Sequence, residues 1–320
     1  TDGGTTFGTV TNMTLNSPRT PALCATAFTS LDCRGFPQVY ANGTNAYVVW
    51  QDDSSSTADT GDVFFRKINY TDSTFTIAPP LTSPPKIINT RTGTDKEYAF
   101  APVIAASATG EFVHIMWSGE SDFANGDDNL YYSKSTNSGE NFSTQTNLSS
   151  GITPASYVQR PDIALDGSKV YVVWEDYIDS TTLADILFTA SSNNGTTFNP
   201  GNAGNPKNLV TNSLSSTDGK DSLHPQIAAA GGNAYVVWDD ARGTNTEIFY
   251  RNSTDIGSTF GPTLSSTATV LSTNGTNNDA EPQIGTNSDG SKVFVTWVDT
   301  NSNVIKFKRS TDSGVTFATI

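Results

Sequence analysis

One phrase recurs five times along the chain and constrains the fold more than any other feature. It joins a proline-led apolar stretch, a glycine-containing turn and a β-branched and aromatic stretch ending in tryptophan, as in HPQIAAAGGNAYVVWDDA. All five tryptophans of the chain occupy this place, at intervals of 57 to 67 residues: Trp50, Trp117, Trp174, Trp238 and Trp297. Self-similarity at such a period is typical of β-propellers and related arrays.

Each repeat unit predicts four antiparallel strands. Proline suits the first position of a strand, because that position needs no ladder donor. The valine- and tyrosine-rich stretch before tryptophan favours a buried second strand. A polar loop then leads to a third strand with alternating apolar residues, as at 247–251, and a tight turn leads to a weaker fourth strand. No window sustains a 3.6-residue apolar period, so no helix is expected and the fold class is all-β.

A second motif occupies the turn after the third strand. It is complete at 253–260 (STDIGSTF) and 310–317 (STDSGVTF), carries Asn for Asp at 135–142 and 191–198, and is partial at 1–7 and 70–75. We expect the Ser and Asp or Asn side chains to bond the turn's own amides, and the glycine to take positive φ. The aromatic residue is expected to fill the space between neighbouring sheets.

This motif, Ser-x-Asp-x-Gly-x-x-Phe, resembles the Asp-box, or bacterial neuraminidase repeat, of sialidase-like β-propellers. The resemblance covers essentially the whole chain, since a tryptophan strand precedes the motif in each unit. It implies the propeller fold. It implies little about activity, because Asp-boxes in that family are structural hairpins away from the catalytic centre, and a fold does not determine a function.

The number of units favours a five-bladed propeller within one domain. Sialidases have six blades, and a sixth blade here would have to be built from residues 1–36, which offer one strand at about 7–15 and a disulfide loop. The expected blades are 37–98, 99–158, 159–222, 223–279 and an incomplete fifth at 280–320.

The first ten residues, TDGGTTFGTV, match the last ten, TDSGVTFATI, at six positions. The last blade lacks an outer strand, and the N-terminal segment has the character of one. Its strand either latches the same ring, or is donated to the next subunit in an open head-to-tail filament, or belongs to a fragment of a longer tandem protein. The strand residues would be Phe7, Val10, Met13 and Leu15.

The composition limits which partners the chain can bind and indicates the compartment in which it is found. The formal net charge of −14 argues against nucleic acid and anionic membrane surfaces, and no apolar run is long enough to span a bilayer. Cys24 and Cys33 are expected to form a local disulfide in an oxidising compartment. Eight glycosylation sequons fit an extracellular or cell-surface protein, although a chain rich in Asn, Ser and Thr also makes sequons by chance. They begin at Asn12, Asn42, Asn69, Asn141, Asn147, Asn194, Asn252 and Asn274.

The sialidase resemblance implies three arginines, a Tyr/Glu nucleophile pair and a further acid. The Arg-Ile-Pro signature of that family is absent from this chain. Substitutes would be Arg19, Arg34 and Arg160, which lie close before prolines. Arg34 and Arg160 are near the starts of innermost strands and could reach the central face, with Arg91 or Arg242 as their third partner and Tyr98 or Tyr157 as the tyrosine. His114 and His224 are isolated in the sequence and do not make a metal site.

Acidic residues recur after the tryptophan strand and again at the start of the third strand. These two sets face each other across one loop, where they either hold Ca²⁺ or stabilise the turn. A position repeated in every blade favours a scaffold role, since a catalytic site needs residues that differ between blades. The calcium candidates are Asp52, Asp62, Asp176, Asp185, Asp240 and Glu247.

We therefore predict a secreted, glycosylated propeller without enzyme activity, used for surface display, adhesion or assembly into an extracellular filament. Its partners would be further copies of the chain or surface glycans and proteins. The alternative is a sialidase-like glycoside hydrolase or a carbohydrate-binding propeller. The enzyme alternative predicts a cluster of non-repeated Arg, Tyr and acidic side chains, whereas assembly predicts that strand 7–15 pairs with another chain.

Overall fold

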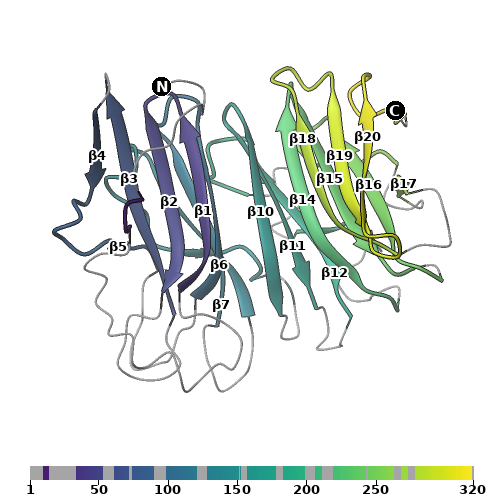
Figure 1. Ribbon diagram of the computed structural model, residues 1–320, viewed down its shortest axis with the longest axis horizontal. Helices are drawn as coiled ribbons and strands as arrows, with labels where there is room; N and C mark the ends of the chain where they lie inside the picture. Colours follow the sequence, from purple (N-terminus) through teal and green to yellow (C-terminus); the bar gives the residue numbers. More distant parts are fainter. Residues whose placement is uncertain are drawn as a thin grey trace. The chain divides into compact units, whose positions relative to one another are not determined.

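The structure is a computed structural model in which the described part of the chain is all β (Figure 1). Within that part, twenty strands form five antiparallel sheets, and no helix could span a bilayer. The described residues are 10–13, 34–52, 61–71, 74–89, 99–120, 128–150, 152, 157–177, 183–198, 206–210, 219–242, 244–262, 268–272 and 278–318.

The sheets follow one another along the sequence, and neighbours in the sequence pair within each sheet. The first contains β1 (Arg34–Asn42), β2 (Asn45–Asp52), β3 (Asp62–Thr71) and β4 (Thr74–Ala78), and β5 (Lys86–Ile87) also pairs with β3. The second contains β6 (Ala99–Ala106), β7 (Val113–Glu120), β8 (Asp128–Ser135) and β9 (Thr146–Asn147). The third contains β10 (Val158–Asp166), β11 (Lys169–Asp176), β12 (Asp185–Ser191) and β13 (Lys207–Asn208).

The fourth sheet contains β14 (Ser222–Ala230), β15 (Asn233–Asp240), β16 (Glu247–Ser253) and β17 (Thr269–Val270). The fifth contains β18 (Asp279–Thr286), β19 (Val293–Asp299) and β20 (Val304–Ser310), three strands within the described residues. Five sheets match the five predicted blades, while the blade boundaries stay predictions. The chain packs as two units, Thr1–Trp117 with Ser133–Gln145, and Ser118–Tyr132 with Thr146–Ile320.

The tryptophans lie in the core, as expected. In the second unit, Trp238 packs in a cluster with Phe188 of β12 and Phe249 of β16, and Trp297 packs in the next cluster with Tyr250. Each of the five indoles is at most 5% exposed. Burial of such a large apolar side chain stabilises the fold by about 1.5–3 kcal/mol, so these clusters bind successive sheets together.

The turn motif has the predicted geometry. At 253–260 the Ser253 hydroxyl donates to Asp255 at 2.9 Å and accepts from the Gly257 N–H at 2.8 Å, while Asp255 accepts from the Thr259 N–H at 2.8 Å. Gly257 has a φ of +78°, and Phe260 meets Phe188 of the preceding sheet edge-on at 5.0 Å between ring centroids. The motif is therefore a hydrogen-bonded turn that packs its aromatic ring against the preceding sheet.

The first strand of each sheet contains an irregularity at its proline. In the sheet of β14 the pairing register shifts between Leu223 and Gln226, so that His224 and Pro225 form a bulge. The residue before each of these prolines has a positive φ of 45° to 53°: Phe36, Ala101, Arg160, His224 and Glu281. Left-handed backbone is uncommon in non-glycine residues, and a following proline normally favours extended backbone, so this conformation is strained in all five sheets.

Candidate functional site

Two positions of the repeat change residue type from sheet to sheet, although the residues around them recur. One is the left-handed residue before proline. The other directly follows tryptophan and is Gln51, Ser118, Glu175, Asp239 or Val298. In the second unit, the inner strands β10, β14 and β18 are neighbours, and both variable positions lie at their bulged ends or beside them. The fold therefore brings non-repeated side chains of three sheets together.

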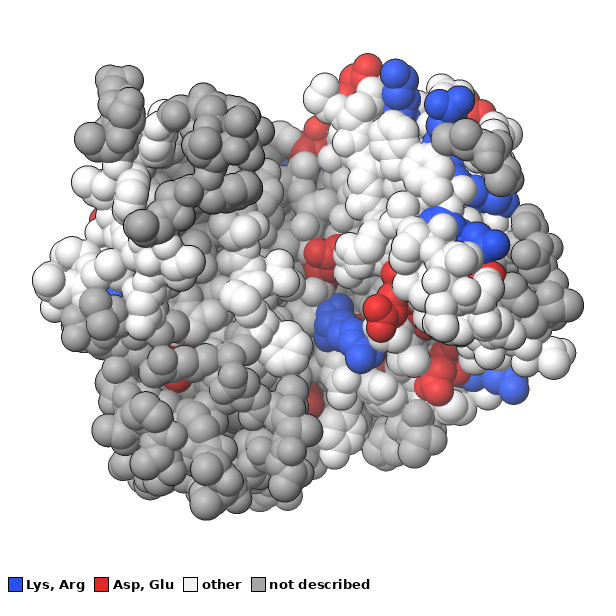
Figure 2. Space-filling view, viewed as in Figure 1, with Lys and Arg blue, Asp and Glu red and all other residues white. Residues whose placement is uncertain are grey.

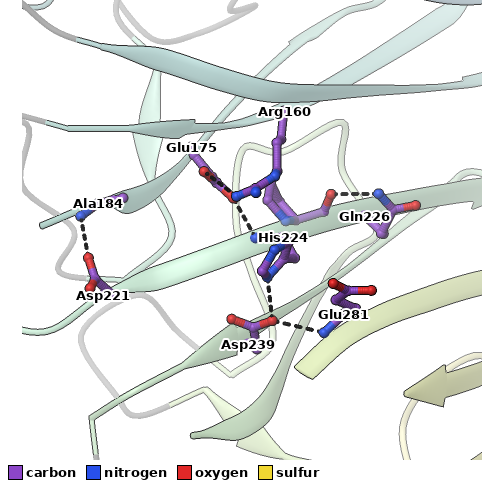
Figure 3. A network of polar contacts seen from close by, with 9 residues as sticks. Arg160, Glu175, Ala184, Asp221, His224, Gln226, Asp239 and Glu281 are labelled. Atoms are coloured by element: carbon purple, nitrogen blue, oxygen red, sulfur yellow. Dashed lines mark hydrogen bonds and ion pairs between the residues drawn. The ribbon is translucent and has the colours of Figure 1, made fainter. Parts of the chain in front are cut away.

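A network of polar contacts joins these residues across the three sheets (Figure 3). The Arg160 guanidinium donates to both carboxylate oxygens of Glu175, at 3.0 and 3.3 Å. The His224 N–H donates to Glu175 Oε1 at 2.6 Å, and His224 Nδ1 lies 2.7 Å from Asp239 Oδ2. The same Asp239 oxygen accepts the Glu281 N–H at 2.9 Å. We call these five residues, Arg160, Glu175, His224, Asp239 and Glu281, the charged cluster.

The charged cluster has a buried layer and an exposed layer. The side chains of Glu175 and Asp239 are 0% and 4% exposed, which requires that their charges be compensated by hydrogen bonds and ion pairs. The side chains of His224 and Arg160 are 26% and 50% exposed, and Glu281 is exposed. The buried carboxylates thus hold the groups that can meet a ligand from solvent.

The electrostatics of the charged cluster follow from these contacts. The hydrogen bond that the His224 ring donates to Asp239 raises the pKa of His224, and this effect outweighs burial and the nearby Arg160 charge. Burial also raises the pKa of Tyr177, which lies within reach of the charges of Glu175 and Arg160. Over the strands of the second unit, Figure 2 shows acidic and basic side chains next to one another rather than a patch of a single sign.

A half-buried acid follows Pro161 in β10. Asp162 accepts the Ile163 N–H at 2.9 Å through Oδ1 and the Ile227 N–H of β14 at 2.9 Å through Oδ2. Burial raises the pKa of Asp162 to about 6, although both hydrogen bonds favour the ionised form. Asp162 therefore links β10 to β14 next to the charged cluster.

The sequence predicts part of this cluster. Arg160, a substitute for a sialidase arginine, lies in the cluster. His224 is not isolated, since Asp239 binds it. Glu175, Asp239 and Glu281 were not predicted from the sequence, although their positions vary in residue type within an otherwise constant phrase. Tyr157 is exposed before β10, and its carbonyl accepts the Tyr177 N–H at 3.2 Å.

Of the other arginine and tyrosine candidates, Arg242 is described and lies outside this cluster. Arg242 donates to Asp240 at 2.8 Å and lies over the Phe249 ring at 4.8 Å from its centroid. Arg34 is in β1, but its side chain is not described. Arg19, Arg91 and Tyr98 fall outside the described residues.

The six calcium candidates pair across strands as predicted, with Asp52 opposite Asp62, Asp176 opposite Asp185, and Asp240 opposite Glu247. Four of them accept hydrogen bonds from indole or amide groups of the scaffold. The Trp174 and Trp238 indoles donate to Asp176 and Asp240, at 2.9 and 3.2 Å. Asn89 donates to Asp62 and Asn208 to Asp185, at 2.9 and 2.7 Å. Within the described residues, no group of three or more His, Cys, Asp or Glu side chains is arranged to hold a metal ion.

The remaining predicted sites are only partly described. Cys24, Cys33, Asn274, Phe7 and Leu15 lie outside the described residues. Residues 10–13 form no strand; Val10 is fully exposed, and the Met13 carbonyl accepts from Arg66 Nε at 2.9 Å. The sequon residues Asn12 and Asn141 are exposed, whereas Asn42, Asn69, Asn147, Asn194 and Asn252 are half-buried.

A groove in the first unit carries less chemistry. It has a volume of about 660 Å³ and runs between β5 and the turn at 139–144, with Lys86, Asn89, Glu140 and Phe142 in its lining. Lys86 Nζ is already bound to the Gly139 carbonyl at 3.0 Å. We therefore place the candidate site at the charged cluster, where non-repeated charged groups meet.

Comparison with known proteins supports the fold and corrects the predicted function. No protein-family model and no curated protein matches the chain. Among solved structures, an α-L-arabinanase of Penicillium chrysogenum is similar at a TM-score of 0.51 and 11% identity, over 83% of this chain and 77% of that one. A GH93 α-L-arabinofuranosidase of Fusarium graminearum is similar at 0.53 and 10% identity, over 88% and 83%.

A Trypanosoma rangeli sialidase reaches a TM-score of only 0.46, with 14% identity over 74% of this chain and 39% of that one, which is too low to confirm the sialidase resemblance. The neighbours are β-propeller glycoside hydrolases. The prediction of a non-enzymatic display, adhesion or filament protein is therefore wrong. The chain has the β-propeller fold of these glycoside hydrolases.

Proposed function

We propose that the chain is a glycoside hydrolase and that the charged cluster is its substrate site. One observation carries the proposal: charged side chains that are not repeated between blades converge from three sheets of an otherwise repetitive scaffold. This is the feature that distinguishes an enzyme from an assembly protein among propellers. The similar solved structures, which are arabinanases and arabinofuranosidases, support the same class of reaction.

The charged cluster supplies the groups that glycoside hydrolysis needs. Cleavage requires a group that protonates the leaving oxygen and a carboxylate that activates water or attacks the sugar. Glu281 offers an exposed carboxylate, and Arg160 offers guanidinium donors to sugar hydroxyls. The buried Glu175 and Asp239 hold these residues in place through their backbone and side-chain contacts.

The first test is a turnover assay on a panel of oligosaccharides, with new reducing ends as the measured product. The panel contains arabinobiose and longer arabino-oligosaccharides, because similar structures act on arabinose linkages, and sialyllactose to test the resemblance to sialidases. Glu281→Gln keeps the shape of the side chain and removes its charge, so we expect kcat/KM to fall about 100-fold or more.

Glu111→Gln is the matched control, since Glu111 is also an exposed glutamate but lies in a turn of the first unit. It should leave kcat/KM unchanged. Equal activity of the Glu281→Gln variant and the original chain would contradict the assignment of the site. The absence of both turnover and binding across the panel would contradict the proposed function.

A second candidate function, sugar binding without hydrolysis, is favoured by one observation. Both buried carboxylates of the charged cluster are already engaged, Glu175 by Arg160 and His224, and Asp239 by His224 and Glu281. That leaves Glu281 as the exposed carboxylate of the cluster. Calorimetry separates the two functions, because a binding protein would release heat with an oligosaccharide and yield no product.

A further inference from the structure

We propose that His224, oriented by Asp239, is the proton-donating catalytic residue of the charged cluster and takes the place of a second carboxylic acid. This inference rests on the proposed function. Glycoside hydrolysis needs two groups that exchange protons, and the cluster has one exposed carboxylate, Glu281. The His224 imidazole can supply the second group, since imidazoles exchange protons near neutral pH.

The two ring nitrogens of His224 have different surroundings. Nδ1 lies 2.7 Å from Asp239 Oδ2, and Asp239 is almost fully buried, so the carboxylate fixes the ring and holds a proton on Nδ1. Among the described residues, no group is hydrogen-bonded to Nε2, and the His224 side chain is 26% exposed. A nitrogen held at one end and open at the other is the arrangement that proton transfer to a ligand requires.

The backbone of His224 is fixed as firmly as its ring. Its φ of 53° directs the side chain out of the ordinary strand position, and Glu175 holds its N–H at 2.6 Å. The Asp239 oxygen that binds the ring also accepts the Glu281 N–H at 2.9 Å. One buried carboxylate therefore sets the positions of the imidazole and of the exposed glutamate next to it.

The reaction balances with these two groups and one water. The imidazolium gives its Nε2 proton to the glycosidic oxygen while the bond from that oxygen to the anomeric carbon breaks, and the bonding electron pair stays on the oxygen. Water adds to the anomeric carbon and gives its proton to the Glu281 carboxylate. Transfer of a proton from Glu281 back to His224 through solvent restores the starting state.

The charged groups that face His224 come from four other strands. Asp239 on β15 and Glu175 on β11 favour the charged imidazolium, and Glu281 on β18 donates its N–H to the same Asp239 oxygen. Arg160 on β10 and partial burial oppose it. The net effect raises the pKa of His224, which keeps the proton available at mildly acidic and neutral pH.

The test uses the leaving group as a probe. A 4-nitrophenyl glycoside of the sugar that the chain cleaves leaves as a stable anion and needs little protonation, whereas a natural disaccharide needs it. We expect His224→Gln to lower kcat/KM on the disaccharide about 100-fold or more and on the aryl glycoside by less than about 10-fold. The alkaline limb of the pH profile on the disaccharide should disappear. Equal losses on both substrates, or an unchanged profile, would overturn the role.

A second measurement tests the pairing of His224 with Asp239 and does not depend on turnover. The chain has two histidines, so its imidazole NMR spectrum contains two sets of signals. Burial and the Lys134 charge lower the pKa of His114 to about 3, so only His224 should titrate between about pH 5 and 8. Asp239→Asn should lower the pKa of His224 by about one unit while the chain stays folded. An unshifted midpoint would overturn the pairing of His224 with Asp239 and with it the proton-donating role, even in an active chain. A shifted midpoint in a chain that acts on no glycoside would overturn the proposed function and the catalytic role of His224, and would leave the pairing in place.

Discussion

Glu175 and Asp176 are adjacent in the sequence but serve different partners. Asp176 accepts the indole N–H of Trp174, and the acid two positions after Trp238 does the same, so this repeated acid is part of the scaffold. Glu175 points to the other side of the strand and binds Arg160 and His224. Alternation along a strand thus separates the scaffold acid Asp176 from Glu175 of the charged cluster.

Asp162 makes the stability of the fold depend on pH. Its pKa in the folded chain is about 6, above the ordinary 3.8, so between these values the folded chain keeps a proton that the unfolded chain loses. The free energy of unfolding should therefore fall as pH rises from about 4 to 6. In urea denaturation, Asp162→Asn should remove this fall. A parallel pH dependence of the variant and the original chain would contradict the burial of an acid at this position.

His224 contributes in a neighbouring pH range with the same sign. Because its folded pKa is raised above its ordinary value, its stabilising effect is complete below that ordinary value and disappears as pH rises through the folded pKa. The difference in unfolding free energy between the original chain and His224→Gln, measured by urea denaturation, should therefore shrink above about pH 6.5. A difference that stays constant across this range would contradict the pairing of His224 with Asp239.

At the scale of the element, the turn motif explains why its glycine is needed. A Cβ on Gly257 would lie 2.2 Å from Phe188 Cε1, and the φ of +78° would strain any other residue. Gly257→Ala should lower the free energy of unfolding by about 2–4 kcal/mol, measured by urea denaturation. Gly219→Ala is the control, since Gly219 has a φ of +81° and an added Cβ would meet nothing within 4 Å, so only the backbone strain of about 1 kcal/mol applies. Equal losses in the two variants would contradict the packing role.

The strands and turns could be predicted where they depend on residues close together in the sequence. The hydrogen bonds of the turn at Ser253 and Asp255 follow from side chains two to four residues apart, and strand alternation follows from single stretches. The charged cluster, in contrast, forms only because strand ends from three different sheets lie next to one another. It also depends on left-handed backbone at Arg160, His224 and Glu281, which the following prolines argue against. The sequence therefore predicts the fold and one of the five cluster residues.

At the scale of the whole chain, a repeated scaffold leaves few positions free to vary. The prolines, tryptophans and turn glycines recur because each sheet packs against its neighbours through the same kinds of side chain and turn. The proposed site lies where the repeat is broken, at the residue before proline and the residue after tryptophan. The described part of the N-terminal segment contacts β3 of its own chain through Met13 and Arg66. The predicted polymer depended on that segment, whereas the broken repeat favours an enzyme.

The most direct test of this account is a crystal structure of the Glu281→Gln variant soaked with the oligosaccharide that the original chain cleaves. We predict a sugar within hydrogen-bond distance of Arg160 and of His224 Nε2, with its glycosidic oxygen facing the imidazole. A sugar bound instead in the groove between Lys86 and Phe142, with the charged cluster unoccupied, would contradict the account.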